Sequence, residues 1–503
     1  MIKGWTGKRL LIDLSLQKAW SEDIPAGELR RWFGGRGLNA SYFSQHFRAP
    51  VSPASPENPI AFAVGPLTGT LAPCSGATSI ASFSPLSGSP VYSFTQMPGH
   101  FGASLKAAGF DQCVIQGKAD RPVYLWIDNG EVKFEKADHL WGQETVETTV
   151  AVQEEKGDRG IEVLCIGPAG EKQIPFANVI HRLSWTGDRL GLGYLFGVKQ
   201  LKAIAIRGKK PITLQDPKQF LNLCLALKDQ IHKGQKMRKL NEDGALSLLG
   251  REDRRGARGA HPWLPTRSEK QWAVSLWANL SGWESCFSCP VHCGRNIQHE
   301  QKCLGGIHLE KAWYLGPQIG VHNGEWTLKL HRFCQAQGLD PFLTASLLGR
   351  ILEGIETGTL AEEDRGHLED IEDQGEKAFA LLRRMIDRGK KEFHLSVPPA
   401  SENEDLDILA DVVSFCMIVV NRLNLMTVSN IIDLIHGATG DALTIQDLHE
   451  TVSNIRQMES RLQNKKLHWN DQSTLLQLGK GQISQILKKE ERRNVSITDR
   501  TAS

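Results

Sequence analysis

Hydrophobic and polar positions follow two different patterns along the chain, and the change falls near residue 210. In the first part, short apolar runs are separated by turn residues, which is typical of β-strands. Runs at residues 122–127 and 131–134 flank Asp128-Asn129-Gly130, a strong hairpin signal. Further strands are expected at residues 161–166 and 202–207, each followed by glycine. The N-terminal part is therefore predicted to be rich in β-structure.

Beyond residue 210 the apolar positions recur at helical spacing instead. Asp216 followed by Pro217 predicts the start of a helix, and apolar residues at helical spacing then continue to Ile231. Thr444 is expected to cap a late helix, and residues 376–399 to form a short amphipathic helix and a loop. This second part of the chain is therefore predicted to be mainly helical.

Composition and charge exclude several classes of protein. The chain has 503 residues, with 59 Lys+Arg against 57 Asp+Glu and a net charge of +2, so no nucleic acid or anionic membrane is expected as its main partner. The longest apolar stretch, near residues 412–420, is shorter than the roughly 20 residues that cross a bilayer. The start of the chain lacks an apolar signal segment, which predicts a cytoplasmic location and reduced or metal-bound cysteines.

A cluster of cysteines is the sharpest chemical signal in the sequence. Cys286, Cys289 and Cys293 lie within eight residues, so that three thiols can point at one centre. An iron–sulfur cube needs a fourth, remote thiolate, whereas a structural zinc ion could use His292. The spacing favours iron–sulfur and leaves zinc as the alternative. Three of the cysteines that occur singly are expected to be core residues: Cys113, Cys165 and Cys224.

Many short motifs follow one another in a fixed order along the chain. They include Phe33–Leu38, Gly65–Thr70, Ser84–Gly88, Gly102–Asp111, Ile166–Glu171 and Leu264–Arg267, followed by the cysteine cluster. In this order they resemble the aldehyde ferredoxin oxidoreductase family, tungsten-pterin enzymes with one [4Fe–4S] cluster. The resemblance covers residues 1 to about 350 and resumes around residues 405–462.

The resemblance implies roles for residues outside the cysteine cluster. The segment Asp411–Cys416 is similar to the family motif that ends in the fourth cluster cysteine, which makes Cys416 the fourth ligand and Asp411 a pterin contact. Glu310 matches the acidic residue near the metal, a candidate general acid or base. Other residues implied in cofactor binding are Arg189, Gly191, Gly193 and Asp340.

Several positions depart from the family pattern. Gln335 stands where the family has the first carboxylate of a pterin motif, and Ala77 stands where it has an arginine. Pro98 lies in the segment that normally faces the pterin phosphates, and Asp188 adds an acid to an anion-binding loop. Residues 376–399 replace the stretch that usually holds an Asp-Pro-Arg-Gly motif and a histidine near the metal.

The resemblance also implies an architecture. The fold class is α+β, with an N-terminal β-rich domain of two sheets followed by two mainly α-helical domains. The expected domains are a pterin-binding-type domain at residues 1–210, a helical domain with the cysteine loop at 211–400 and a shortened helical domain at 401–480. A polar tail follows at residues 481–503.

Two functions follow from these expectations. The first is an oxidoreductase that oxidises an aldehyde or related oxo compound to an acid at a tungsten- or molybdenum-bis-pterin. It would pass electrons through the [4Fe–4S] cluster to ferredoxin or a ferredoxin-like subunit, and could form homo-oligomers. The second is a divergent paralogue that keeps the cluster without the aldehyde site and serves as an electron-transfer or scaffold subunit. A structural zinc protein on the same fold is the third and least favoured alternative.

Overall fold

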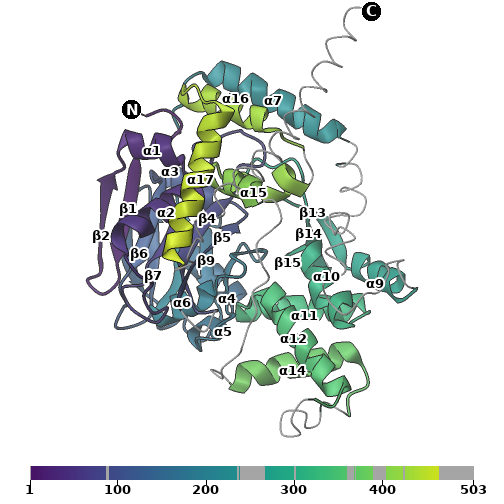
Figure 1. Ribbon diagram of the computed structural model, residues 1–503. Coiled ribbons are helices and arrows are strands. Elements are labelled where there is room, and N and C mark those ends of the chain that lie inside the picture. The colour runs from purple at the N-terminus through teal and green to yellow at the C-terminus, as the bar shows by residue number, and fades with distance from the viewer. Residues whose placement is uncertain are drawn as a thin grey trace, which may run out of the picture.

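The chain forms a β-rich N-terminal part followed by mainly helical parts, which confirms the expected α+β class (Figure 1). The computed structural model describes residues 2–86, 90–234, 237, 267–299, 302–359, 368, 370–388, 404–422 and 425–463. The predicted tail at residues 481–503, residues 464–480 and the first three residues of the motif Leu264–Arg267 lie outside the described residues. Within the described residues, no helix has the length and apolar character that crossing a membrane requires.

Two six-stranded sheets make up the described N-terminal part, as the resemblance implied. The first sheet has the order β2-β1-β6-β3-β4-β5, and β1 and β6 are its parallel pair. Its strands are β1 Lys8–Asp13, β2 Lys18–Asp23, β3 Ile60–Ala63, β4 Thr78–Ser84, β5 Val91–Met97 and β6 Gln112–Gln116. Three helices accompany this sheet: α1 Ala26–Trp32, α2 Gly35–His46 and α3 Phe101–Ala108.

The second sheet has the order β11-β10-β9-β12-β7-β8. Its strands are β7 Val123–Asp128, β8 Glu131–Lys136, β9 Glu162–Ile166, β10 Val179–His181, β11 Trp185–Thr186 and β12 Leu201–Arg207. The predicted hairpin is confirmed, since β7 and β8 pair antiparallel and the turn residues Asn129 and Gly130 both have positive φ. The helices of this region are α4 Thr145–Glu155, α5 Pro168–Glu171 and α6 Leu192–Val198.

The two sheets share a core in which α3 lies. Leu105 of α3 belongs to the same buried cluster as Ile80 of the first sheet and Ile204 of the second. Along β12 the alternate residues Ala203 and Ala205 face a separate core on the other side of the sheet. This period of two is why the apolar runs of this part predicted strands correctly.

The middle of the chain adds a small sheet and a group of helices. Strands β13 Leu280–Glu284, β14 Gly294–His299 and β15 Lys302–His308 form an antiparallel sheet that the sequence reading did not predict. The cysteine loop is the connection between β13 and β14. The helices here are α9 Arg267–Trp277, α10 Leu309–Leu315, α11 Gly324–Gln337, α12 Pro341–Glu356 and α14 Gln374–Arg388, with a 3₁₀ turn η2 at Pro317–Ile319.

The last described segments are helices that pack back onto the N-terminal part (Figure 1). They are α15 Glu404–Val412, a π-helical turn η4 Ile418–Arg422, α16 Val428–Thr439 and α17 Ile445–Leu462. Helix α7 Pro217–Lys233 packs against α16 although it precedes the middle region in sequence. Both predicted caps are confirmed, because the side chains of Asp216 and Thr444 accept from backbone N–H groups of α7 and α17.

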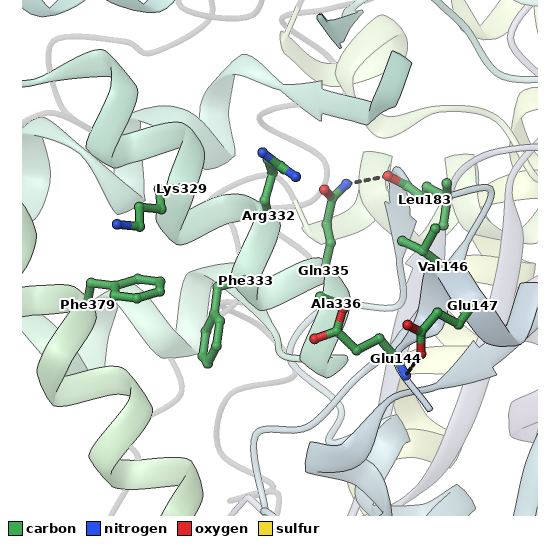
Figure 2. A pocket seen from close by; sticks show the side chains of 10 residues that line it. All are labelled: Glu144, Val146, Glu147, Leu183, Lys329, Arg332, Phe333, Gln335, Ala336 and Phe379. Carbon is green, nitrogen blue, oxygen red and sulfur yellow. Dashed lines mark hydrogen bonds between the residues drawn. The ribbon is translucent and has the colours of Figure 1, made fainter. Parts of the chain in front are cut away.

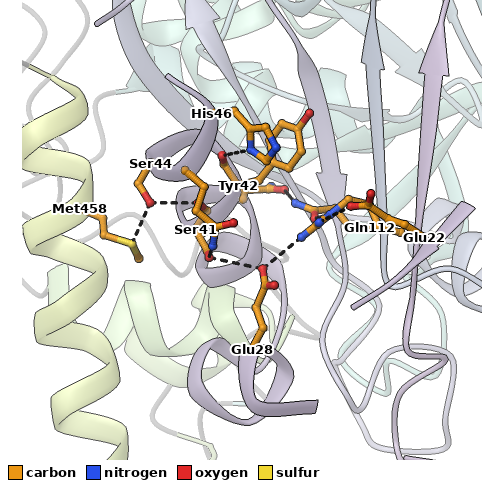
Figure 3. A network of polar contacts seen from close by, with 11 residues as sticks. Glu22, Glu28, Ser41, Tyr42, Ser44, His46, Gln112 and Met458 are labelled. Carbon is orange, nitrogen blue, oxygen red and sulfur yellow. Dashed lines mark hydrogen bonds and ion pairs between the residues drawn. The ribbon is translucent and has the colours of Figure 1, made fainter. Parts of the chain in front are cut away.

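Helix α2 is fixed between the first sheet and α17 by polar contacts as well as by packing. Figure 3 shows Ser44 of α2 beside Met458 of α17, with the Ser44 Oγ and Met458 Sδ atoms 3.4 Å apart. On the other side of the helix, the buried Arg9 of β1 bonds to Gln112 at 2.5 Å and pairs with Glu28 at 3.1 Å. At its start, α2 lies directly against the end of α15, because a Cβ on Gly35 would clash with the Asp411 carbonyl oxygen.

Candidate metal centre

The cysteine loop is a tight turn between β13 and β14 that rests on the N-terminal part. The Cys289 N–H donates to the Cys286 carbonyl at 3.1 Å, which closes the first turn of the loop. Ser288 and His292 have φ values of 54° and 49°, so the chain reverses sharply twice. The Ser288 hydroxyl donates to the Leu71 carbonyl at 3.1 Å and ties the loop to the first domain.

A second loop, Asp411–Cys416, approaches from the end of α15. Ser414 has a φ of 61°, and its hydroxyl accepts the Gly65 N–H at 2.7 Å. The Cys416 N–H donates to the Cys74 carbonyl at 2.9 Å. Two loops more than a hundred residues apart in sequence are therefore held against the same N-terminal segment, which places Cys416 beside the cysteine loop.

The four predicted cysteines, Cys286, Cys289, Cys293 and Cys416, come together in the structure; we call this group the cysteine centre. Burial and the neighbouring thiols raise the pKa of Cys286 and Cys293 well above the usual thiol value, and Cys416 contributes to both shifts. Four thiolates held so close repel one another, so the group needs a cationic partner before it can ionise fully. Its donor set therefore fits a metal ligand group.

A fifth cysteine, Cys74, lies against this centre, and the sequence analysis did not predict this role for it. The Sγ atoms of Cys74 and Cys289 are 3.6 Å apart, although the two residues are separated by 215 positions. A hydrogen bond with Cys74 lowers the pKa of Cys289, and the same bond raises the pKa of Cys74 well above its usual value. Cys74 stands alone in the sequence, so no local spacing marked it as a site residue.

Backbone groups of the N-terminal part close the other side of the cysteine loop. The Phe287 N–H donates to the Gly99 carbonyl at 3.1 Å, and a backbone hydrogen bond from Gly99 acts to lower the pKa of Cys286 against the larger effect of burial. A Cβ on Gly76 would lie 3.0 Å from the carbonyl oxygens of Gly99 and Phe287. The segment that departs from the family pattern at Pro98 thus packs directly on the cysteine loop.

Asp411 occupies a buried, charged pocket beside the motif of α2. It is 2% exposed, and its Oδ2 lies 3.9 Å from Nη1 of Arg36. Burial raises the pKa of Asp411 to about 7, although the Arg36 charge acts in the opposite direction. Arg36 instead donates two hydrogen bonds of 2.7 Å to the Glu459 carboxylate. Asp411 is thus a buried carboxylate with an incomplete ion pair.

Four predicted cofactor residues meet where α6 and α12 begin; we call this group the Asp340 junction. Its members are Arg189, Gly191, Gly193 and Asp340. Asp340 caps α12 by accepting the N–H groups of Phe342 and Leu343, and its other oxygen accepts the Arg189 N–H. Burial, followed by the nearby Asp188 charge, raises the pKa of Asp340 to about 7.

The two glycines of the Asp340 junction are required by close packing. Gly191 has a φ of 72° and is the N-cap residue directly before α6. A Cβ on Gly193 would lie 2.5 Å from the Asn178 nitrogen, so only glycine fits there. These contacts are made within the chain, and the structure therefore gives the junction a definite architectural role.

Glu310 is half-buried in the first turn of α10. The next residue, Lys311, is buried, bonds to the Thr186 hydroxyl and lies 3.5 Å from a carboxylate oxygen of Asp188. Gln335 donates its amide to the carbonyls of Leu183 and Gly306, the latter at 2.9 Å. The amide that replaced a family carboxylate thus binds two backbone acceptors that a carboxylate would repel.

A cavity of about 490 Å³ opens beside Gln335, between the start of α4 and helices α11 and α14. Figure 2 shows the Gln335 side chain directed at Leu183, with Phe333 and Phe379 on the opposite side of the view. The lining residues are Glu144, Val146, Glu147, Leu183, Lys329, Arg332, Phe333, Gln335, Ala336 and Phe379. None of the predicted site residues is among them.

Comparison with known families explains why this fold and these motifs occur together. The family model described as "Aldehyde ferredoxin oxidoreductase, N-terminal domain" matches residues 9–208, and the model for "domains 2 & 3" matches residues 265–393. The chain belongs to the aldehyde ferredoxin oxidoreductase family. The matched segments of this family member contain both sheets, the cysteine loop and the Asp340 junction, whereas Asp411 and Cys416 lie beyond them.

Curated relatives of this aldehyde ferredoxin oxidoreductase family member include tungsten enzymes. The tungsten-containing aldehyde ferredoxin oxidoreductase of Pyrococcus abyssi is 32% identical over 378 residues, which cover 72% of this chain and 60% of the relative. The Pyrococcus furiosus enzyme of the same name is 30% identical, with 73% and 61% covered. The chain therefore spans about 60% of the length of these relatives.

Two further comparisons extend the range of likeness. The WOR-like subunit of an aliphatic sulfonate oxidoreductase from Pyrococcus furiosus is 26% identical over 414 residues, covering 76% of this chain and 64% of the relative. The solved active site complex BamBC of benzoyl coenzyme A reductase has a TM-score of 0.78 at 19% identity, with 93% of this chain and 90% of that chain covered. This structural likeness concerns the fold alone.

Proposed function

We propose that this chain is an iron–sulfur oxidoreductase whose cysteine centre binds a [4Fe–4S] cluster. It would oxidise an aldehyde or a related oxo compound to an acid at a tungsten- or molybdenum-pterin and pass the electrons through the cluster to ferredoxin or a ferredoxin-like subunit in the cytoplasm. The observation that carries the proposal is the meeting of four thiols from two distant loops, with Cys293 buried and the other three half-buried. Membership of the family supports the reaction class.

The composition and surroundings of the cysteine centre support a cluster over a single zinc ion. The centre consists of cysteines alone, and an iron–sulfur cube is held by four thiolates. The Gly99, Val291 and His292 backbones supply N–H groups to the sulfurs, which is typical of the protein groups that tune such a cluster.

The residues proposed for the pterin are Arg189, Gly191, Gly193, Asp340 and Asp411, with Glu310 as general acid or base. A bound tungsten- or molybdenum-pterin would supply the two-electron oxidation of the substrate. Asp411 is suited to contact a ligand, because its carboxylate is buried and only weakly paired. Glu310 is half-exposed at a helix start, where it can hold or release a proton.

The alternative function is an electron-transfer or scaffold subunit that keeps the cluster without the aldehyde site. The contacts of three residues favour it. Asp340 is engaged by three backbone N–H groups, Gln335 by two carbonyls and Lys311 by Thr186 and Asp188. Polar groups satisfied within the chain have less capacity to bind a cofactor.

Metal analysis of the anaerobically purified full chain separates these proposals. We expect about four iron atoms per chain, together with stoichiometric tungsten or molybdenum. Iron without either heavier metal would support the electron-transfer subunit instead. Zinc without iron would contradict both proposals and leave a structural zinc protein.

A further inference from the structure

We propose that Cys74 is a functional fifth thiol of the cysteine centre. It would donate a hydrogen bond to the Cys289 sulfur and thereby raise the reduction potential of a cluster bound there. This inference rests on the proposed function, because it requires a cluster ligated by Cys289. It assigns to Cys74 a tuning role, distinct from that of the four ligands.

Ligation of iron by Cys289 would fix which of the two sulfurs donates. The Sγ atoms of Cys74 and Cys289 lie 3.6 Å apart, within the distance of an S–H···S hydrogen bond. When Cys289 ligates iron it is a thiolate and has no proton to give. Cys74 then holds the only proton between the two sulfurs and must be the donor.

The chain holds Cys74 in this position from both sides. Its φ is 64°, a left-handed conformation that is uncommon for residues other than glycine. Its carbonyl accepts the Cys416 N–H at 2.9 Å, so the same residue touches both loops of the centre. The next residue, Ser75, donates its hydroxyl to the carbonyls of Leu67 and Ala72, each at 3.0 Å. The thiol is therefore positioned by a rigid loop.

The surroundings strengthen the effect of such a bond. Cys74 is 1% exposed and belongs to an apolar core that also contains Cys293 and Val291. A hydrogen bond is stronger where water is excluded. Reduction adds negative charge to the cluster and its sulfur ligands, so a donor stabilises the reduced state more than the oxidised one.

The test is an anaerobic redox titration of the full chain, followed by electron paramagnetic resonance, with iron counted in each variant. At the potential where the wild type is half reduced, we expect Cys74→Ala to lower the ratio of reduced to oxidised cluster by roughly tenfold. Cys74→Ser should give a ratio between those of the wild type and Cys74→Ala, because the serine hydroxyl can still donate a hydrogen bond. The control is Cys224→Ala, a buried cysteine of the same core.

Each outcome decides the inference. It is overturned if the cluster of Cys74→Ala has the same reduction potential as that of the wild type. It is also overturned if Cys74→Ser lowers the reduction potential as much as Cys74→Ala does. Loss of iron from both variants but not from Cys224→Ala would also overturn it and make Cys74 a ligand. Absence of iron from the wild type is a different result, because it removes the proposed function itself.

Discussion

The cysteine centre and the Asp340 junction both join segments far apart in the sequence, but their polar groups are satisfied in different ways. At the Asp340 junction, the carboxylate accepts hydrogen bonds from three backbone N–H groups. Neighbouring atoms of the chain occupy the space that a Cβ on either glycine would need. In the cysteine centre, burial and then the neighbouring thiols raise the pKa of Cys286 and Cys293, so their thiolate forms are disfavoured within the chain alone.

This difference distinguishes a group of residues proposed to hold a ligand from one whose polar groups are satisfied within the chain. A buried group of like charges is retained only if something of opposite charge compensates it. A carboxylate that caps a helix stabilises the fold by itself. Substitutions in the cysteine centre should therefore change mainly the iron content of the chain. Substitutions at the Asp340 junction should change mainly its free energy of unfolding.

The largest effect is expected in the cysteine centre. Cys293→Ala removes one of four thiolates, so we expect loss of most of the bound iron, measured per chain after anaerobic purification. The matched control is Cys165→Ala in β9, a buried cysteine whose pKa is raised to about 11 by burial. Full iron content in Cys293→Ala would exclude this residue as a ligand.

Restoring the family carboxylate at residue 335 tests whether that position is now structural. In Gln335→Glu a carboxylate would replace the amide that donates to the Leu183 and Gly306 carbonyls. We expect the free energy of unfolding to fall by about 3 kcal/mol, because buried acceptors lose their donor and face a charge. Urea unfolding measures this, and Gln335→Ala should be less harmful. Equal stability of wild type and Gln335→Glu would contradict the assignment.

Truncation at the Asp340 junction should have a smaller effect on stability. Asp340→Ala removes the cap of α12 and the acceptor of the Arg189 N–H. We expect a loss of about 2 kcal/mol in unfolding free energy with unchanged iron content. Iron loss comparable to that of Cys293→Ala would show that the two regions are not independent.

The smallest expected effect is on the pH dependence of stability. The pKa of Asp340 is raised to about 7 in the folded chain, above its usual value of 3.8, so the folded state binds more protons than the unfolded state between these values. The stabilising contribution that this pKa shift makes to the free energy of unfolding is therefore fully present below about pH 4. It is lost as the pH rises toward 7. Asp340→Asn should flatten this part of the profile in urea titrations. An unchanged slope would refute the shift.

Local features of the fold were predictable because their causes are local. The Asp128-Asn129-Gly130 turn, the caps Asp216 and Thr444 and the buried strands follow from conformational preference and periodicity. The sheet β13–β15 escaped prediction because its strands are glycine-containing and polar, with little alternation. Its pairing is set by tertiary context.

Site residues were predictable only where they are close in sequence or shared with a family. The spacing of the three cysteines in the loop predicted them as metal ligands, whereas only the family resemblance predicted Cys416. Cys74 had neither signal, since only the fold brings it to Cys289. Asp340 is followed by Pro341, the same Asp-Pro signal that marks the start of α7, so its capping role could have been inferred from sequence.

The most direct test of the central claim is to count iron and acid-labile sulfide in the wild type and in Cys416→Ser, with Cys113→Ser as the control. Cys113 is buried in β6 and is not part of the cysteine centre. We predict about four of each per chain in the wild type and in the control, with most of both lost in Cys416→Ser. One zinc ion per chain without sulfide, or full retention in Cys416→Ser, would contradict the account.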